Sequence, residues 1–148
     1  MPCGSATMQR RSRVFLDTSA LLAGLNSPTG AAGAILVACF SGEIVPLISP
    51  QVIEEAERNI SLKFPMLDNA WHSFLLIPPH VTKKPAILQV RKAYALLPTS
   101  DAPILASAIA SKPDALVTWD VKHFLRANVV ASVEFPVLTP GEFLARFF

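Results

Sequence analysis

The chain is short of charged residues, and this scarcity limits what it can bind by charge alone. Lys, Arg, Asp and Glu make up only 16% of its 148 residues, and the formal net charge is +2. Arg10, Arg11 and Arg13, near the N-terminus, carry more positive charge than that total, so the rest of the chain is close to neutral. A protein that holds nucleic acid through bulk positive charge is therefore excluded.

Cysteine is also scarce, and long apolar runs are missing. Cys3 and Cys39 form no CxxC pair, so we expect a reduced, cytoplasmic protein without a disulfide framework or a zinc knuckle. No stretch of 18 or more residues is free of both charge and proline, as a membrane span requires. The segment MPCGSATMQRRSR lacks the apolar centre of a secretory signal. We expect a disordered basic tail over residues 1–12, followed by one domain over residues 13–148.

Short strand-like runs alternate with longer helical segments along the chain. Strands are expected at residues 14–16, 44–48, 115–118 and 137–138, and Pro46 indicates that part of the second strand is at an edge or unpaired. Helices are expected from Ser19, over 30–41, from Ser49, over 67–76, 86–97 and 102–111, and from a capping box at Thr139. This order predicts a three-layer α/β/α fold with a central, mainly parallel twisted sheet.

Two carboxylates directly follow expected strands. Asp17 ends the first strand, and Asp120 comes after the run ALVT. Sites in open α/β sheets form at the carboxyl ends of parallel strands, so both side chains are expected at one edge of the sheet. Each has a simpler interpretation as a helix cap, Asp17 for the helix near Ser19 and Asp120 for VKHFLR.

A third acid, Asp101, begins the helical segment DAPILASAIA. It falls on the same helical face as Ile104, Leu105 and Ala108, which predicts that it points inward. A capping role is the simpler alternative, and Ser100 is equally suited to it.

The helix after Ser49 carries three glutamates. Its apolar face is formed by Val52, Ile53, Ala56 and Ile60. Glu54 lies well away from that face, whereas Glu55 and Glu57 lie on its two flanks, so the helical pattern leaves both as candidates. A helix rich in glutamate is most often simply solvated.

Acids gathered at one edge would repel one another strongly without a cation. Hard divalent ions bound by oxygen remove this repulsion, and Mg²⁺ or Mn²⁺ held by carboxylates and water fits best. Such a site suits metal-assisted hydrolysis of phosphodiester bonds. His72, His80 and His123 lack a local metal-ligand spacing and are interpreted as surface or packing residues; of the three, only His123 lies near the proposed site.

The segments FLDTSALL, SPQVIEEAERNI, DAPILASAIA and LVTWDVKHF, in this order, resemble a PIN-domain ribonuclease. The closing VLTPGEFLARFF is similar to the end of many bacterial PIN proteins that are toxin components, so the resemblance runs from Arg13 to Phe148. It implies a PIN-like fold and selects Glu55 through its place in S-P-x-h-h-x-E, where h is apolar. It marks Ser19 and Thr118 as polar neighbours of the metal site. The catalytic and metal-binding acids that it implies are Asp17, Glu55, Asp101 and Asp120.

The resemblance also implies an activity and partners. We expect a Mg²⁺- or Mn²⁺-dependent endoribonuclease with an RNA substrate, the toxin of a toxin–antitoxin pair of the VapC-like kind, with a cognate antitoxin and without a membrane. Two other functions stay open: a PIN scaffold that binds RNA or protein without cleaving, and a PIN nuclease that acts on DNA or in RNA processing. Two departures from the pattern are Trp119, where a small residue is common, and Ser100, where a further acid could stand.

The resemblance to toxin PIN proteins also implies a homodimer. The chain is 51% hydrophobic, which suggests that a monomer would expose an apolar patch. The segments 31–40 and 70–76 carry the most apolar side chains, including Trp71 and Phe74, and we place the interface there. Burial of both segments in the core is an equally good interpretation.

Overall fold

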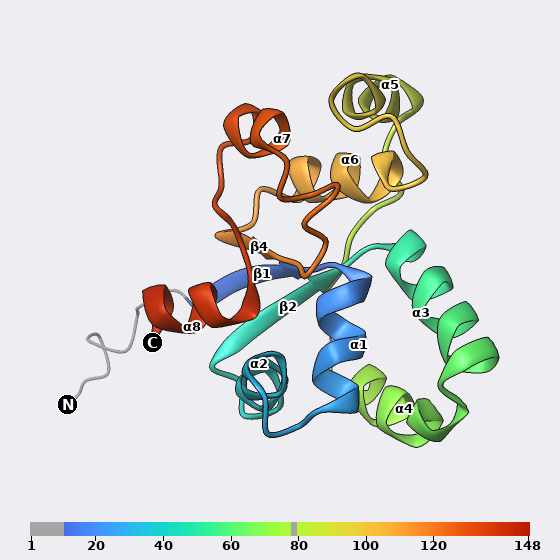
Figure 1. Ribbon diagram of the computed structural model, residues 1–148, viewed down its shortest axis with the longest axis vertical. Coiled ribbons are helices and arrows are strands. Elements are labelled where there is room, and N and C mark those ends of the chain that lie inside the picture. Colours follow the sequence, from blue (N-terminus) through green and yellow to red (C-terminus); the bar gives the residue numbers. More distant parts are fainter. Residues whose placement is uncertain (1–10, 78–79) are drawn as a thin grey trace.

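The computed structural model describes residues 11–77 and 80–148, and its strands and helices alternate as expected (Figure 1). Residues 1–10 of the expected tail lie outside the described residues, and the first strand already includes Ser12. The strands are β1 (Ser12–Leu16), β2 (Ile44–Ile48), β3 (His80–Val81), β4 (Ala115–Val117) and β5 (Val137–Leu138). The α-helices are α1 (Thr18–Asn26), α2 (Ala31–Phe40), α3 (Pro50–Lys63), α4 (Asp68–Leu76), α5 (Ile87–Leu96), α6 (Ala102–Ser111), α7 (Ala127–Ser132) and α8 (Pro140–Phe147). A 3₁₀ turn, Pro65–Leu67, joins α3 to α4.

The strands form one five-stranded sheet in the order β3-β2-β1-β4-β5, and every pairing is parallel. The expectation of a mainly parallel sheet is confirmed. The first strand, β1, lies in the centre, where its Phe15 is in register with Leu47 of β2 on one side and with Leu116 of β4 on the other. Pro46 pairs with Val14 of β1, whereas β3 reaches only the last two residues of β2, so the described sheet leaves Pro46 a strand neighbour on one side only.

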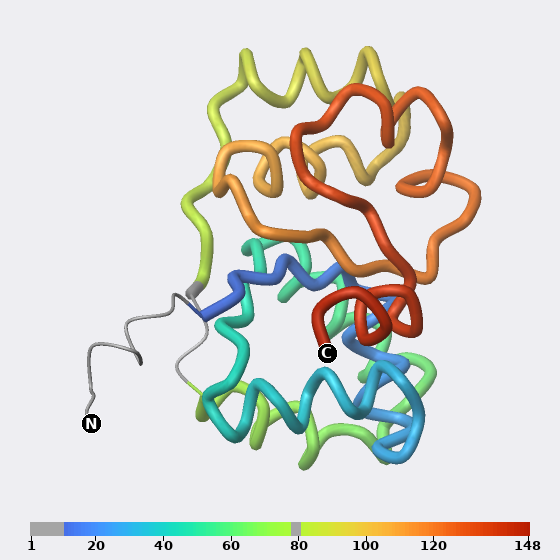
Figure 2. Tube along the Cα trace, turned by 90° about the vertical axis from the view of Figure 1, so that its left-hand side faces the viewer, coloured from blue at the N-terminus to red at the C-terminus, as the bar shows by residue number. Residues whose placement is uncertain are grey.

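Helices cover both faces of the sheet, as the three-layer prediction requires. In Figure 1, α5, α6 and α7 lie on one side, and α1, α2 and α8 on the other, with α3 and α4 beyond α1. The turned view of Figure 2 shows the same separation, with the sheet between the two groups. The core centres on β1, whose residues Val14, Phe15 and Leu16 are at most 1% exposed.

Besides the 3₁₀ turn, a short strand and a short helix were not predicted from the sequence. β3 has only two residues. The residue after it, Thr82, extends the pairing with β2, because its backbone N–H donates to Ile48 O at 2.8 Å. α7, with the sequence ANVVAS, contains residues of weak helix propensity. Tertiary contacts stabilise it instead, because Val129 is fully buried and Asn128 Nδ2 donates to Leu96 O of α5 at 2.8 Å.

α1 and α2 pack at a bend of 90°. Among the described residues no single helix is long and apolar enough to cross a membrane, and this pair reaches the required length and hydropathy only together. Gly24 permits their close approach, since a Cβ atom there would lie 2.7 Å from Leu36 Cδ1 and 2.9 Å from Ala32 O.

Trp71 and Phe74 of α4 lie in the core rather than on a surface. They are 1% and 0% exposed, and their rings stack with centroids 6.0 Å apart. Trp71 Nε1 also donates to Glu57 Oε2 of α3 at 3.2 Å. The interface placed on these two residues is therefore wrong. Core packing of α4 is the correct interpretation.

Truncation of Trp71 tests this assignment. We expect Trp71→Ala to lower the free energy of unfolding by about 3–5 kcal/mol, because it leaves a cavity in a close-packed core. Leu76→Ala is the matched control on the same helix, since Leu76 is 85% exposed and its truncation should cost under about 0.5 kcal/mol. Chemical denaturation measures both values, and similar costs for the two variants would contradict the core assignment.

Candidate metal centre

β1 and β4 end side by side, and their pairing brings the first acids to one edge of the sheet. Leu16 is in register with Val117, and Asp17 N donates to Val117 O at 3.1 Å. Asp17 therefore follows β1 where Thr118 follows β4. This edge is the carboxyl end of the parallel sheet, the place where sites form in open α/β folds.

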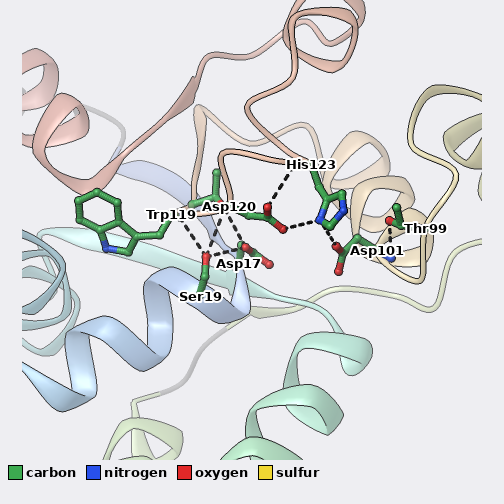
Figure 3. Close-up of polar contacts among 8 residues, drawn as sticks. Asp17, Ser19, Thr99, Asp101, Trp119, Asp120 and His123 are labelled. Atoms are coloured by element: carbon green, nitrogen blue, oxygen red, sulfur yellow. Dashed lines mark hydrogen bonds and ion pairs between the residues drawn. The ribbon is translucent and has the colours of Figure 1, made fainter.

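Hydroxyl groups hold the Asp17 carboxylate. The residue is 3% exposed, and its Oδ2 accepts hydrogen bonds from Ser19 Oγ and Thr118 Oγ1, each at 2.8 Å (Figure 3). The same two hydroxyls bind the backbone of the neighbouring loop: Trp119 N donates to Ser19 Oγ at 3.0 Å, and Asp120 N donates to Thr118 Oγ1 at 2.9 Å. Asp17 holds the N-cap position of α1, but in the described chain its side chain makes no capping bond, so capping does not account for the carboxylate.

The surroundings of Asp17 oppose its ionisation. Burial raises the pKa of the Asp17 carboxyl above its ordinary value, and the negative charge of Glu55 adds to the rise. The hydrogen bonds from Thr118 and Ser19 oppose this change because they stabilise the carboxylate. Asp17 is therefore a fixed, poorly solvated oxygen donor.

Asp120 is held by the turn that follows it. Its Oδ1 accepts the backbone N–H of His123 at 3.1 Å, and its Oδ2 lies 2.9 Å from His123 Nδ1. Residues 121–125 form turns where VKHFLR was considered as a helix. The capping interpretation is thus correct for one oxygen of Asp120, although the capped element is a turn.

Asp101 is the N-cap residue of α6, but in the described chain its side chain makes no capping bond and points inward. Its side chain is 14% exposed, and its Oδ2 lies 3.4 Å from His123 Nδ1 (Figure 3). Burial raises the pKa of Asp101 to about 6, the charges of Asp17, Glu55 and Asp120 contribute to the rise, and His123 opposes it. Three other carboxylates therefore act on this one group.

Packing separates the three glutamates of α3. Glu54 is exposed, and Glu57 is exposed but accepts the indole N–H of Trp71. Glu55 is half-buried, and its charge raises the pKa of both Asp17 and Asp101. Of the two candidates that the helical pattern left open, Glu55 is the one whose charge acts on Asp17 and Asp101.

The tightest group combines two acids with a histidine. Among the residues that the structure describes, ligand atoms of Asp101, Asp120 and His123 lie within 4.8 Å of one another. Asp17 and Glu55 act on this group through their charges. His123 was not among the predicted site residues, although its spacing of three from Asp120 was a signal, since a turn brings such residues together.

This donor set fits a hard divalent cation. Oxygen atoms dominate it, and the mutual repulsion that raises the pKa of Asp101 would be removed by a cation between the carboxylates. Asp101 and Asp120 could reach one ion, and Asp17, which Ser19 and Thr118 orient, and Glu55 act on the same group through their charges.

Trp119 borders this group without entering it. The residue is 47% exposed, and in Figure 3 its ring lies on the opposite side of Asp17 from His123 and Asp101. The bulky side chain at this position therefore does not lie between Asp17 and the group of Asp101 and His123. Ser100, the other departure from the expected pattern, is exposed beside Asp101.

Neutralising Asp101 should stabilise the fold when metal is absent. The pKa of Asp101 is raised in the folded state, so its ionisation destabilises that state. This loss of stability is small below about pH 4, grows as the pH rises from about 4 to about 6, and is fully present above about 6. In EDTA at about pH 7.5, Asp101→Asn should raise Tm by about 3 °C or more, and the gain should largely disappear near pH 4. Glu54→Gln, on an exposed position, is the control. A lower Tm for Asp101→Asn in thermal scans at both pH values would instead assign Asp101 a structural role.

Comparisons with known proteins agree with this fold. PAE2754 from Pyrobaculum aerophilum is 18% identical, with a TM-score of 0.61 over 91% of this chain and 94% of that chain. VapBC2 from Rickettsia felis, bound to a DNA fragment from their promoter, contains a chain that is 19% identical, with a TM-score of 0.58 over 85% of this chain and 96% of that one. The comparison with curated proteins found no match. A family model described as the PIN domain matches residues 13–122, well over half of the chain, and this protein therefore belongs to the PIN-domain family.

Proposed function

We propose that this protein is a divalent-cation-dependent endoribonuclease and the toxin of a toxin–antitoxin pair. The observation that carries the proposal is the group of carboxylates at the carboxyl edge of the sheet. There the charges of Asp17, Glu55 and Asp120 contribute, with burial, to the raised pKa of Asp101. Such a concentration of like charge destabilises the fold and is best explained by a cation-dependent reaction. The PIN-domain match supports a nuclease as the class of enzyme.

Each acid has a distinct way of being positioned for this reaction. Asp17 and Asp120 are fixed by strand ends and by the shared hydroxyl of Thr118, whereas Asp101 and Glu55 approach from α6 and α3. A bound Mg²⁺ or Mn²⁺ supplies Lewis-acid chemistry, since it stabilises the charge that develops on a phosphate and activates water for attack. Because the pKa of Asp101 is about 6, cation binding should release a proton below neutral pH.

The toxin role and the partners extend this proposal. They rest on the resemblance of the sequence motifs to VapC-like toxins. We propose that a small antitoxin protein binds this chain and that the chain forms a homodimer in the cytoplasm. With Trp71 and Phe74 in the core, the exposed apolar residues Val37 and Phe40 of α2 support a contact surface there.

Incubation with nucleic acid tests the activity. Purified protein should cleave a mixed RNA pool in Mg²⁺ or Mn²⁺, and EDTA should abolish cleavage because the carboxylates cannot replace the cation. A single-stranded DNA pool of matched length is the control. Binding of RNA without cleavage would contradict the enzyme and favour a scaffold, and preferential cleavage of DNA would contradict the RNA substrate.

The three glutamates of α3 give a second test. We expect Glu55→Gln to lower kcat/KM for RNA by at least about tenfold, because it removes a charge that faces the other acids. Glu54→Gln should have little effect on cleavage or stability. Glu57→Gln should alter stability through its bond to Trp71 and leave kcat/KM nearly unchanged. Initial rates at equal folded concentration decide this, and a larger loss in Glu57→Gln would show that the wrong glutamate is assigned.

A further inference from the structure

The turn after β4 holds His123 firmly beside two of the acids. Leu125 N donates to Asp120 O and Arg126 N donates to His123 O, both at 3.2 Å, in addition to the bond from His123 N to the Asp120 side chain. The next residue, Phe124, is fully buried in the core. The backbone of His123 is therefore anchored on both sides, and its ring is held by the contact between Nδ1 and Asp120 Oδ2.

Distances around the imidazole match those between ligands of one ion. His123 Nδ1 lies 2.9 Å from Asp120 Oδ2 and 3.4 Å from Asp101 Oδ2, and the three ligand atoms lie within 4.8 Å of one another. Two ligand atoms that are each about 2.1 Å from an ion, at a right angle, are about 3.0 Å apart. One nitrogen and two oxygens, from two separate segments of the chain, can therefore reach one cation with small side-chain movements.

A role as counter-ion does not account for this arrangement. A protonated imidazole carries a single positive charge, whereas four carboxylates surround or face the group. The ring therefore leaves most of the negative charge uncompensated. A neutral imidazole, by contrast, is a good ligand for a divalent cation that compensates the charge.

We propose that His123 joins Asp101 and Asp120 in a mixed nitrogen–oxygen metal subsite that favours Mn²⁺ and other first-row transition cations over Mg²⁺. The inference rests on the proposed function, since it assigns a ligand and a selectivity to the same centre. Mg²⁺ is bound mainly by carboxylate and water oxygens, whereas imidazole suits transition metals. A site with this nitrogen should therefore discriminate between cations that an all-carboxylate site would bind more equally.

Spectroscopy of the Mn²⁺-loaded wild-type protein tests the ligand directly. Pulsed electron paramagnetic resonance should detect the coupling of a directly bound ¹⁴N nucleus, and His123→Asn should abolish it. Asn is chosen because its amide can keep a hydrogen bond to Asp120. A signal that persists in this variant would assign the nitrogen to another residue and overturn the inference.

Calorimetric titration tests the selectivity. His123→Asn should weaken Mn²⁺ binding by about tenfold or more and Mg²⁺ binding by less than about threefold. His72→Asn is the matched control, because His72 Nδ1 also lies near one carboxylate, Asp68, at 3.5 Å, on an exposed part of α4. Its affinities for both ions should equal those of the wild type.

The outcomes separate this inference from the proposed function. If the wild type binds Mn²⁺ and cleaves RNA but shows no ¹⁴N coupling, or if His123→Asn weakens both ions equally, the nitrogen ligand is wrong and the nuclease stands. If the wild type binds neither ion, both proposals fail. A ¹⁴N coupling and a selective loss of Mn²⁺ affinity, in a protein without RNA cleavage, would support the subsite and reject the nuclease.

Discussion

The burial of one carboxylate, that of Asp17, is the constraint on which the rest of this site depends. A charge removed from water is costly unless hydrogen bonds replace the lost solvation, and Ser19 and Thr118 supply two of them. The same hydroxyls accept hydrogen bonds from the backbone N–H groups of Trp119 and Asp120. The groups that stabilise the Asp17 carboxylate therefore also fix the loop that carries Asp120 and His123. Asp101 and Glu55 add further negative charge to this region, and the repulsion between the carboxylates lowers the stability of the fold.

Much of this arrangement follows from local sequence signals. The apolar runs before Asp17 and Asp120 predict buried strands, and parallel strands in an α/β sheet end at the same edge, so the positions of these two acids could be predicted. Asp101 shares a helical face with Ile104 and Leu105, and its inward direction follows from that spacing. Parallel-strand topology is sufficient to place Asp17 and Asp120, and helical spacing is sufficient to place Asp101.

Other features depend on contacts that a helical pattern does not contain. The choice between Glu55 and Glu57 is made by α4, whose Trp71 takes Glu57 as a hydrogen-bond partner. α7 forms because Val129 enters the core, although its own sequence favours a helix weakly. His123 is brought to the acids by a turn rather than by a helix, and its role could not be read from the distances between histidines along the chain.

The pairing of β1 with β4 also has a consequence for how the protein is made. The bond from Thr118 Oγ1 to Asp17 Oδ2 joins residues 101 positions apart, and the central strand has no partner on that side until β4 is available. Loop closure over such a distance is slow, and a nascent chain on the ribosome begins to fold from its N-terminal part. Asp17 and Glu55 are therefore synthesised long before the residues that complete their surroundings. A chain halted before residue 115 would contain Asp17, Glu55 and Asp101 but neither Thr118 nor Asp120, so these three acids would not yet share an assembled centre.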